Sequence, residues 1–303
     1  MGIIDSFIKR IKAMRRQESK ASAIPARLRH EETAQADQQP FLVAFAQSTG
    51  LERKHNEDAL LVMVHNSAGE ESTADFALFV VADGMGGHRS GEIASAIAAR
   101  TFARRLAQDT YSDLLDYDAH GHNRVPILDV VRQAFMDANL QVVRMLPGGG
   151  TTLTAVVMLG EQLTFGHVGD SRAYVIYENE TKLLTRDHTF PARLLEMGEI
   201  TTEEVINHPQ RHVLYRAIGQ GDSLEVDVFT HPTPHGNQLL ICSDGLWGVV
   251  PNDRILDIVS NASHPQDACD ELIRAANRGG GPDNITAVLV QFPPRVETEP
   301  GNE

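Results

Sequence analysis

Consecutive apolar residues form several short runs in this chain, each bounded by polar or turn-forming residues. Phe76–Ala82 and Leu239–Cys242 are the clearest runs, and Leu163–Val168 is a less regular one. Runs of this kind predict strands that are buried on both faces. The pattern predicts further strands at Phe41–Gln47, Ala59–Val64, Thr152–Met158, Ala173–Tyr177 and Ile285–Phe292.

Other segments repeat apolar residues at helical spacing. Glu92 lies in the first turn of the predicted helix Ser90–Ala107, whose apolar face comprises Ile93, Ile97, Phe102 and Leu106. The spacing predicts further helices at Val125–Met145, Asn252–Ser260 and Gln266–Asn277, and a polar helical stretch at Ala192–Asn207. Because strands come in runs and helices in pairs, we expect an α+β layered sandwich rather than an alternating parallel sheet.

The first forty residues differ from the rest of the chain. Residues 1–16 combine apolar and basic side chains at helical spacing and predict a basic amphipathic helix. Residues 17–40 are polar and predict a linker. Such a helix either adsorbs to an anionic membrane surface, docks on a partner, packs on its own domain or frays. Met1–Ser6 also fits the loose N-myristoylation pattern, which acts only in a host that has the transferase.

Composition and charge narrow the possible functions. The chain has 303 residues, of which 42% are hydrophobic and 22% charged, as is typical of globular proteins. The net charge is −14, although residues 1–30 hold eight Lys and Arg against two acidic residues. The remaining residues are therefore strongly acidic, which argues against nucleic-acid binding by the main domain.

The sequence predicts neither a membrane span nor a signal peptide. No apolar run is long enough to span a bilayer, and the N-terminus lacks the pattern of a signal peptide. Cys242 and Cys269 show neither metal-ligand spacing nor a disulfide framework, which fits a reducing compartment. We expect a cytoplasmic protein, peripheral at the inner face of the membrane if residues 1–16 bind lipid. Residues 293–303 are expected to form a disordered acidic tail.

Five separated segments set an acidic residue among small residues, and three of them follow predicted strands. They are Asn56-Glu57-Asp58, Asp83-Gly84-Met85-Gly86-Gly87, Gly169-Asp170-Ser171-Arg172, Ser243-Asp244-Gly245 and Gly281-Pro282-Asp283-Asn284. Each segment alone is also explained as a tight turn. Together they indicate a cation site, because carboxylates gathered at strand ends repel one another and are costly to desolvate. Hard divalent cations bind such oxygen ligands, and these centres most often hydrolyse phosphate esters.

Taken in order, these segments resemble the metal-dependent Ser/Thr protein phosphatase family (PPM, type 2C) in its bacterial branch. The resemblance covers about residues 41–292 and also includes Gly150-Thr151-Thr152-Leu153, His167-Val168 and Cys242. It implies a four-layer αββα sandwich, with central antiparallel β-sheets flanked by helix pairs and the metal centre at one end. It further implies Mn²⁺ or Mg²⁺ as cofactor and phosphoserine or phosphothreonine in proteins as substrate.

The resemblance implies metal ligands at five positions. Asp83 matches the carboxylate that bridges two core metals, and Gly84 matches a ligand that coordinates through its carbonyl. Asp244 and Asp283 match the remaining direct ligands of one core metal. Asp170 matches a ligand of a weaker third metal, which it shares with Asp244. Two cations roughly 3.5–4 Å apart would activate a bridging hydroxide and clamp the phosphoryl oxygens.

Other positions are matched to substrate binding and support. Arg53 matches the residue that grips the substrate phosphate, for which a planar guanidinium is well suited. Glu57 matches a residue that holds metal-bound water, and Asp58 matches its hydrogen-bonding neighbour. Asn284 is expected to support the metal ligands from behind.

One departure from the family concerns the general acid. Eukaryotic relatives have a histidine directly after the Asp-Gly pair, whereas this chain has Met85 there and His88 three residues later. Either His88 protonates the leaving alkoxide, or it is a helix-start or surface residue and metal-bound water supplies the proton. We favour water.

Residues 185–219 resemble the flap of the family, a polar helical insert near the site. The alternative is a surface hairpin without a special role. The resemblance favours hydrolysis of phosphoserine and phosphothreonine on proteins, reversing a cognate Ser/Thr kinase in bacterial signalling. Alternatives are a catalytically inactive pseudophosphatase that binds phosphoproteins, and a phosphatase that regulates a partner switch. The substrate, the kinase, the oligomeric state and the choice of Mn²⁺ or Mg²⁺ are not encoded in these patterns.

Liposome flotation tests the membrane hypothesis for residues 1–16. The full chain should float with vesicles that contain anionic lipid, and a chain lacking residues 1–16 should not, because the basic residues of that segment supply the attraction. Vesicles of neutral lipid are the control. Equal flotation of the two chains would exclude membrane binding by this segment.

Overall fold

The structure is a computed structural model that describes residues 41–65, 75–86, 89–112 and 125–295. The predictions for residues 1–40, for His88 and for most of the C-terminal tail lie outside the described residues.

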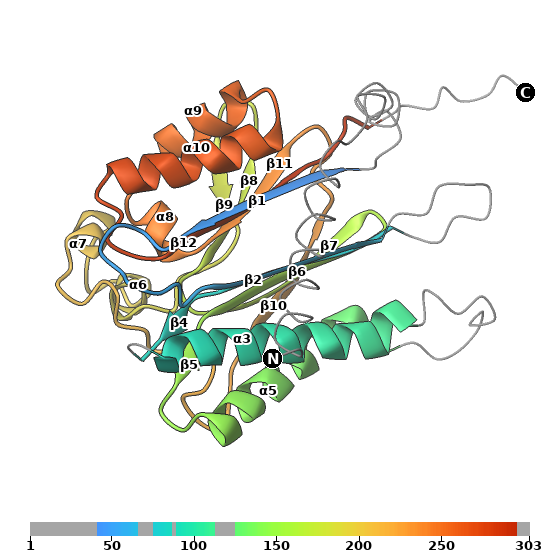
Figure 1. Ribbon diagram of the computed structural model, residues 1–303, viewed down its shortest axis with the longest axis vertical. Helices are drawn as coiled ribbons and strands as arrows, with labels where there is room; N and C mark the ends of the chain where they lie inside the picture. The colour runs from blue at the N-terminus through green and yellow to red at the C-terminus, as the bar shows by residue number, and fades with distance from the viewer. Residues whose placement is uncertain (1–40, 66–74, 87–88, 113–124, 296–303) are drawn as a thin grey trace, which may run out of the picture. The chain divides into compact units, whose positions relative to one another are not determined.

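Two five-stranded sheets form the centre of this part of the chain (Figure 1). The strands of the first sheet, in spatial order, are β1 (Leu42–Ser48), β12 (Ile285–Gln291), β11 (Gln238–Cys242), β8 (Arg172–Ile176) and β9 (Thr181–Leu183). Those of the second are β10 (Asp227–Pro232), β7 (Gln162–Val168), β6 (Leu153–Leu159), β3 (Phe76–Ala82) and β2 (Ala59–His65). All neighbouring strands in both sheets are antiparallel. The short strands β4 (Gly84–Met85) and β5 (Gly150–Thr151) pair with each other.

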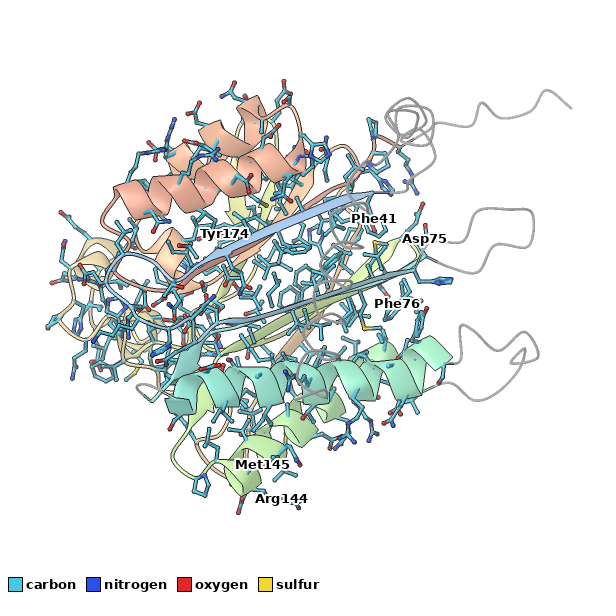
Figure 2. All side chains as sticks on the ribbon, in the orientation of Figure 1. Phe41, Asp75, Phe76, Arg144, Met145 and Tyr174 are labelled. Atoms are coloured by element: carbon cyan, nitrogen blue, oxygen red, sulfur yellow. The ribbon has the colours of Figure 1, made fainter. Side chains whose placement is uncertain are left out.

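Helix pairs cover the outer faces of the sheets (Figure 1). The first sheet is covered by α9 (Asn252–Asn261) and α10 (Pro265–Arg278), and the second by α3 (Arg89–Leu106) and α5 (Ile127–Met145). Helix α3 continues into a π-helical turn, η3 (Ala107–Tyr111). Three hydrophobic clusters fill the interfaces between the four layers (Figure 2). The cluster with Tyr174 lies under α9 and α10, the cluster with Phe41 lies between the two sheets, and the cluster with Phe76 lies under α3 and α5. The predicted αββα sandwich is thus confirmed.

The helical stretch predicted at Ala192–Asn207 is wrong in one respect, because it consists of two short helices. These are α6 (Phe190–Glu196) and α7 (Thr202–Ile206), separated by a turn in which Gly198 has φ +73°. Thr201 caps α7 by accepting a hydrogen bond from the backbone N–H of Glu204. Both helices lie within residues 185–219, the predicted flap. A bridge between Thr189 and Leu214 joins two parts of this segment, and a bridge between Thr151 and Ile218 joins its end to β5.

Strands β9 and β10 are not predicted by the apolar pattern. Both lie at sheet edges, and their residues are at most half-buried, so that neither has the continuous apolar run of a central strand. Among the described residues, no helix has the length and hydrophobicity required to cross a membrane.

Gly166 in β7 tests the packing of α5 on the second sheet. A methyl group at this position would overlap the ring of Phe135 and would crowd Val131, both on α5. We expect Gly166→Ala to lower the free energy of unfolding by about 1–3 kcal/mol, as overpacking of a core does. Urea unfolding measures this change. Gly221→Ala is the control, since its added methyl meets no atom within 4 Å; equal stability of the two variants would contradict the packing described here.

Candidate metal centre

Antiparallel pairing brings the acidic segments together at one end of the sheets. Asp83 directly follows β3, while Asp58 directly precedes β2, the neighbour of β3. Strands β11 and β12 are also neighbours, and Asp244 lies two residues beyond the end of β11, while Asp283 lies two residues before the start of β12. In such pairs the end of one strand lies beside the start of the next, so residues far apart in sequence converge.

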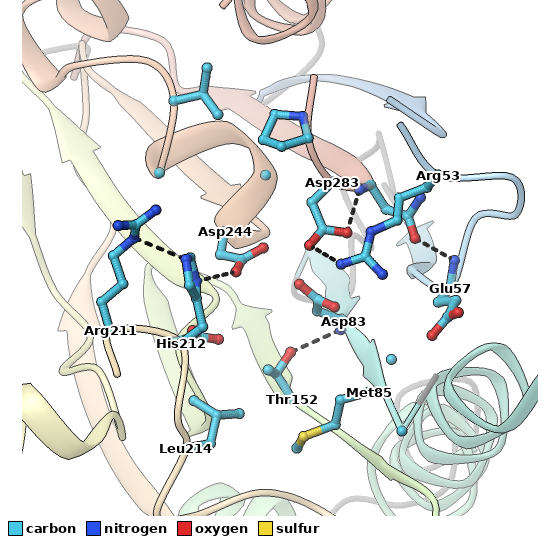
Figure 3. Close-up of a pocket in the computed structure, with 18 residues that line it drawn as sticks. Arg53, Glu57, Asp83, Met85, Thr152, Arg211, His212, Leu214, Asp244 and Asp283 are labelled. Carbon is cyan, nitrogen blue, oxygen red and sulfur yellow. Dashed lines mark hydrogen bonds and ion pairs between the residues drawn. The ribbon is translucent and has the colours of Figure 1, made fainter. Parts of the chain in front are cut away.

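A cavity of about 480 Å³ opens at this end of the sheets (Figure 3). Asp83, Asp244 and Asp283 line it together with Arg53 and Glu57, as Figure 3 shows. Its remaining lining residues include Gly84, Met85, Thr152, Asp170, Arg211, His212, Leu214 and Asn284. The four aspartates and the glycine predicted as metal ligands thus share one cavity.

The backbone of Asp83 is fixed by β5 and by the residue between β5 and β6. Its N–H donates to Thr152 Oγ1 at 2.9 Å, and its carbonyl oxygen accepts from Thr151 Oγ1 at 2.8 Å. A hydrogen bond of 2.8 Å joins the Thr152 and Ser171 hydroxyl groups. These bonds hold the Asp83 carboxyl group at the cavity without using its own oxygens.

Gly84 is required for close packing rather than for an unusual turn. A side chain at Gly84 would overlap the backbone of Gly91 at the start of α3. The φ angle of Gly84 is not positive. A side chain at Gly91 would in turn overlap the carboxylate of Glu57. The sequence suggests a sharp turn at Gly84, and it gives no signal for Gly91, because only the folded chain brings these segments together.

Asn284 holds the loop that carries Arg53 and Glu57. Its Oδ1 accepts from the Glu57 N–H at 2.7 Å, and its Nδ2 donates to the carbonyl oxygens of Thr49 and His55, each at 2.9 Å. The Asn284 side chain is buried, so these bonds are shielded from water. Arg53 is half-exposed, and its Nη2 donates to Asp283 Oδ2 at 2.7 Å.

Asp58 lies behind the cavity rather than in its lining. Its Oδ2 accepts hydrogen bonds from Thr286 Oγ1 at 2.6 Å and from Ser243 Oγ at 2.9 Å. Burial raises the pKa of Asp58 to about 7, an effect that these two bonds partly oppose. Because Ser243 directly precedes Asp244, Asp58 acts on the backbone that carries that aspartate.

The carboxyl groups at the cavity are electrostatically strained. Burial raises the pKa of Asp83 well above its usual range, and the charges of Asp58, Asp244, Asp170 and Asp283 raise it further. The pKa of Asp170 is also well above its usual range, because of burial and then the charge of Asp244. Within the described residues, the buried Oδ1 atoms of Asp58 and Asp244 have no hydrogen-bond partner. A bound cation would relieve each of these penalties.

The donor atoms fit a hard divalent cation. The acidic side chains of the cavity offer carboxylate oxygens, which Mg²⁺ and Mn²⁺ prefer. In the part of the chain that the structure describes, no three His, Cys, Asp or Glu side chains are grouped closely enough to hold one ion. Mg²⁺ sites commonly combine one or two carboxylates with several waters.

The flap contributes cavity residues that the sequence analysis does not assign to the site. His212 Nδ1 lies 3.6 Å from Asp244 Oδ2, and Arg211 Nε donates to His212 Nε2 at 2.9 Å (Figure 3). The available signal is the segment His208-Pro209-x-Arg211 within the predicted flap. The position of His88 lies outside the described residues, so its assignment stays a prediction.

The chain is similar in sequence to known proteins over most of its length. The family model described as protein phosphatase 2C matches residues 52–289. The chain is 37% identical over 247 residues to the serine/threonine phosphatase stp of Listeria welshimeri, and the match covers 82% of this chain and 94% of that protein. It is 36% identical to the serine/threonine protein phosphatase PstP of Mycobacterium tuberculosis, covering 79% of this chain and 43% of that protein.

Solved structures show the same fold. The crystal structure of the M. tuberculosis phosphatase PstP/Ppp has a TM-score of 0.68 at 33% identity, covering 84% of this chain and 99% of that chain. The catalytic domain of PstP in complex with two manganese ions has a TM-score of 0.66 at 32% identity, covering 84% of this chain and 98% of that chain.

Replacing Asp83 tests the repulsion between the carboxylates. Asp83 binds its proton more tightly in the folded state than in the unfolded state. Its contribution to the stability of the metal-free protein is therefore lost as pH rises above the ordinary aspartate pKa of about 3.9. Asn cannot ionise, so we expect Asp83→Asn to become more stable than wild type as pH rises, by up to about 1.4 kcal/mol per pH unit.

Urea unfolding in EDTA at a series of pH values from 4 to about 8 measures this difference. Asp222→Asn, at an exposed position outside the cavity, is the matched control. A stability difference for Asp83→Asn that is constant or that shrinks with rising pH would show that Asp83 is not under this strain.

Proposed function

Because the chain belongs to the protein phosphatase 2C family of metal-dependent Ser/Thr protein phosphatases, we propose that it hydrolyses phosphoserine and phosphothreonine in proteins at the carboxylate-lined cavity. The observation that carries the proposal is the convergence of Asp83, Asp244 and Asp283 on one cavity with Arg53. Carboxylates and a guanidinium beside an open space suit the binding of cations and of a phosphate dianion, respectively.

We assign the metal-binding roles by residue. Asp83 and the carbonyl oxygen of Gly84 would hold two core cations, with Asp244 and Asp283 completing the ligand set of one of them. Asp170 and Asp244 would share a third, weaker cation, for which their common position at the cavity is the support. When bound, the core cations supply a hydroxide nucleophile at neutral pH and neutralise charge on the phosphoryl oxygens.

The other residues bind and orient. Arg53 reaches the cavity from a loop held by Asn284, and we assign it to the substrate phosphate. Its bond to Asp283 turns the guanidinium toward the acidic wall of the cavity. Glu57 lines the same wall and would hold water there. Asp58 orients Ser243 and thereby the backbone that leads into Asp244.

Protonation of the leaving alkoxide needs a separate source. Met85 lines the cavity at the position after the Asp-Gly pair, and a thioether cannot donate a proton. We therefore assign the proton to water in the cavity, with His88 as the alternative.

The biological role follows from the chemistry. A phosphoprotein substrate requires a Ser/Thr kinase, and we propose that this phosphatase reverses the action of one. Binding of the basic residues 1–16 to an anionic membrane would bring it near substrates at that surface.

Asp244→Asn tests the proposed function. Hydrolysis of p-nitrophenyl phosphate and of a phosphothreonine peptide should require Mn²⁺ or Mg²⁺, and EDTA should abolish it. In the variant, kcat/KM should fall at least about a hundredfold, because a ligand of the cations is weakened. Asp253→Asn, with the same charge change at an exposed position on α9, should retain wild-type activity.

Two outcomes would contradict the proposal. Turnover that is independent of divalent metal would exclude the metal mechanism. Tight Mn²⁺ binding without turnover of either substrate would instead indicate a pseudophosphatase.

A further inference from the structure

The turn that carries Asp170 is bonded to the segment that carries Asp244, through a residue that the proposed mechanism does not use. Asp170 lies between β7 and β8, whereas Asp244 begins α8 (Asp244–Trp247) after β11. The two carboxylates thus belong to different segments, and their like charges repel. Some neutral contact must hold them near each other if they are to share one cation.

Trp247 makes that contact. It is the only tryptophan in the sequence and lies three residues after Asp244 in α8. Its indole Nε1 donates a hydrogen bond of 2.9 Å to the backbone carbonyl oxygen of Asp170. The bond joins the two carboxylate-bearing segments directly, without involving either carboxylate.

The ring of Trp247 is itself held by Arg172. The guanidinium carbon of Arg172 lies 3.5 Å from the centroid of the Trp247 ring, a distance at which a cation–π interaction is strong. Arg172 is two residues after Asp170, so the ring is bound at two points of the same turn. Rotation of the indole away from Asp170 would break both contacts.

The Arg172 side chain is itself held by Asp187, near the start of the flap. Its Nε and Nη2 donate to the two carboxylate oxygens of Asp187 at 3.0 and 2.7 Å, and its Nη1 donates to the Tyr174 hydroxyl at 3.0 Å. The ion pair is largely buried, with side-chain exposures of 20% and 12%. A bidentate pair of this kind fixes the plane of the guanidinium and therefore the surface on which the indole lies.

His188, the next residue of the flap, bonds to the turn at Gly169. The His188 N–H donates to the Gly169 carbonyl oxygen at 2.7 Å, and the Gly169 N–H donates to His188 Nδ1 at 3.0 Å. The turn that carries Asp170 is therefore bonded to the flap through Gly169 and Arg172, and to α8 through Trp247.

We propose that Trp247 is a positioning residue, which together with Arg172 sets the separation of Asp170 and Asp244 so that both carboxylates can bind one divalent cation. This inference rests on the proposed function, because it takes Asp170 and Asp244 as ligands of the weakest of the bound cations. We expect Trp247 to affect this ion alone, because its bond is accepted by the backbone of Asp170. Asp244, which also binds a core cation, follows Ser243, whose hydroxyl group is bonded to Asp58 and Thr286 without the indole.

Mn²⁺ binding to the full-length protein tests the proposal, with free Mn²⁺ followed by electron paramagnetic resonance. Trp247→Phe keeps an aromatic ring beside Arg172 but removes the N–H that binds Asp170. We expect its weakest Mn²⁺ dissociation constant to rise about tenfold, as is usual when a residue supporting a ligand is changed. The tighter constants should stay as in wild type, and activity should recover at high Mn²⁺ concentration.

Tyr174→Phe and Asp170→Asn are the matched variants. Tyr174→Phe removes one bond of Arg172 but leaves its bidentate pair with Asp187 and the indole N–H in place, so it should lower thermal stability without changing Mn²⁺ affinity. Asp170→Asn removes the ligand itself and should abolish the weakest binding step. The emission of Trp247 gives a second readout, because paramagnetic Mn²⁺ bound beside Asp170 should quench it in wild type but much less in Asp170→Asn.

Three results would overturn the proposal: a weakest constant that Trp247→Phe leaves unchanged, an equal weakening of all constants, or wild-type binding of two ions only. The test is separate from that of the proposed function. A wild-type protein that binds Mn²⁺ as expected but hydrolyses no phosphate ester would refute the function and leave the positioning role intact.

Discussion

Repulsion between like charges at one end of the two sheets is the constraint on which the rest of the site depends. Asp83, Asp170, Asp244 and Asp283 line one cavity, and the charges of these acids raise the pKa values of their neighbours. A fold gains nothing in stability from such an arrangement by itself. It is maintained because the surrounding backbone is fixed by groups other than the carboxylates, among them Thr152, Ser243 and Asn284.

The supporting bonds share a common design. Neutral hydroxyl, amide and indole groups hold the backbone beside Asp83, Asp170 and Asp244 without using their carboxylate oxygens. Asp283 differs, because its carboxylate accepts hydrogen bonds from Arg53 and from the Asn284 N–H. Asp58 is the charged exception, and it lies behind the cavity, where Ser243 and Thr286 satisfy one of its oxygens. The bidentate pair of Arg172 and Asp187 has a similar role, because it connects the site to the root of the flap while staying outside the cavity.

Much of this could be predicted from the sequence. Phe76–Ala82 is a buried strand with the predicted bounds, because an uninterrupted apolar run has few alternatives to a central strand. The acidic residues at strand ends were also sufficient to predict one shared site. What the pattern does not reveal depends on contacts between distant segments: the closeness of Gly84 to Gly91, the bond from Trp247 to Asp170, and the approach of His212 to Asp244. Edge strands such as β10 are partly exposed to water, so they lack the continuous apolar run by which a central strand is predicted.

The most direct measurement of the central claim is the anomalous scattering of Mn²⁺ in crystals of the full-length protein. Strong peaks are expected within coordination distance of Asp83, Asp244 and Asp283, and a weaker one between Asp170 and Asp244. Crystals grown in saturating Mn²⁺ that show no peak in this cavity, or peaks that contact none of these aspartates, would contradict this claim.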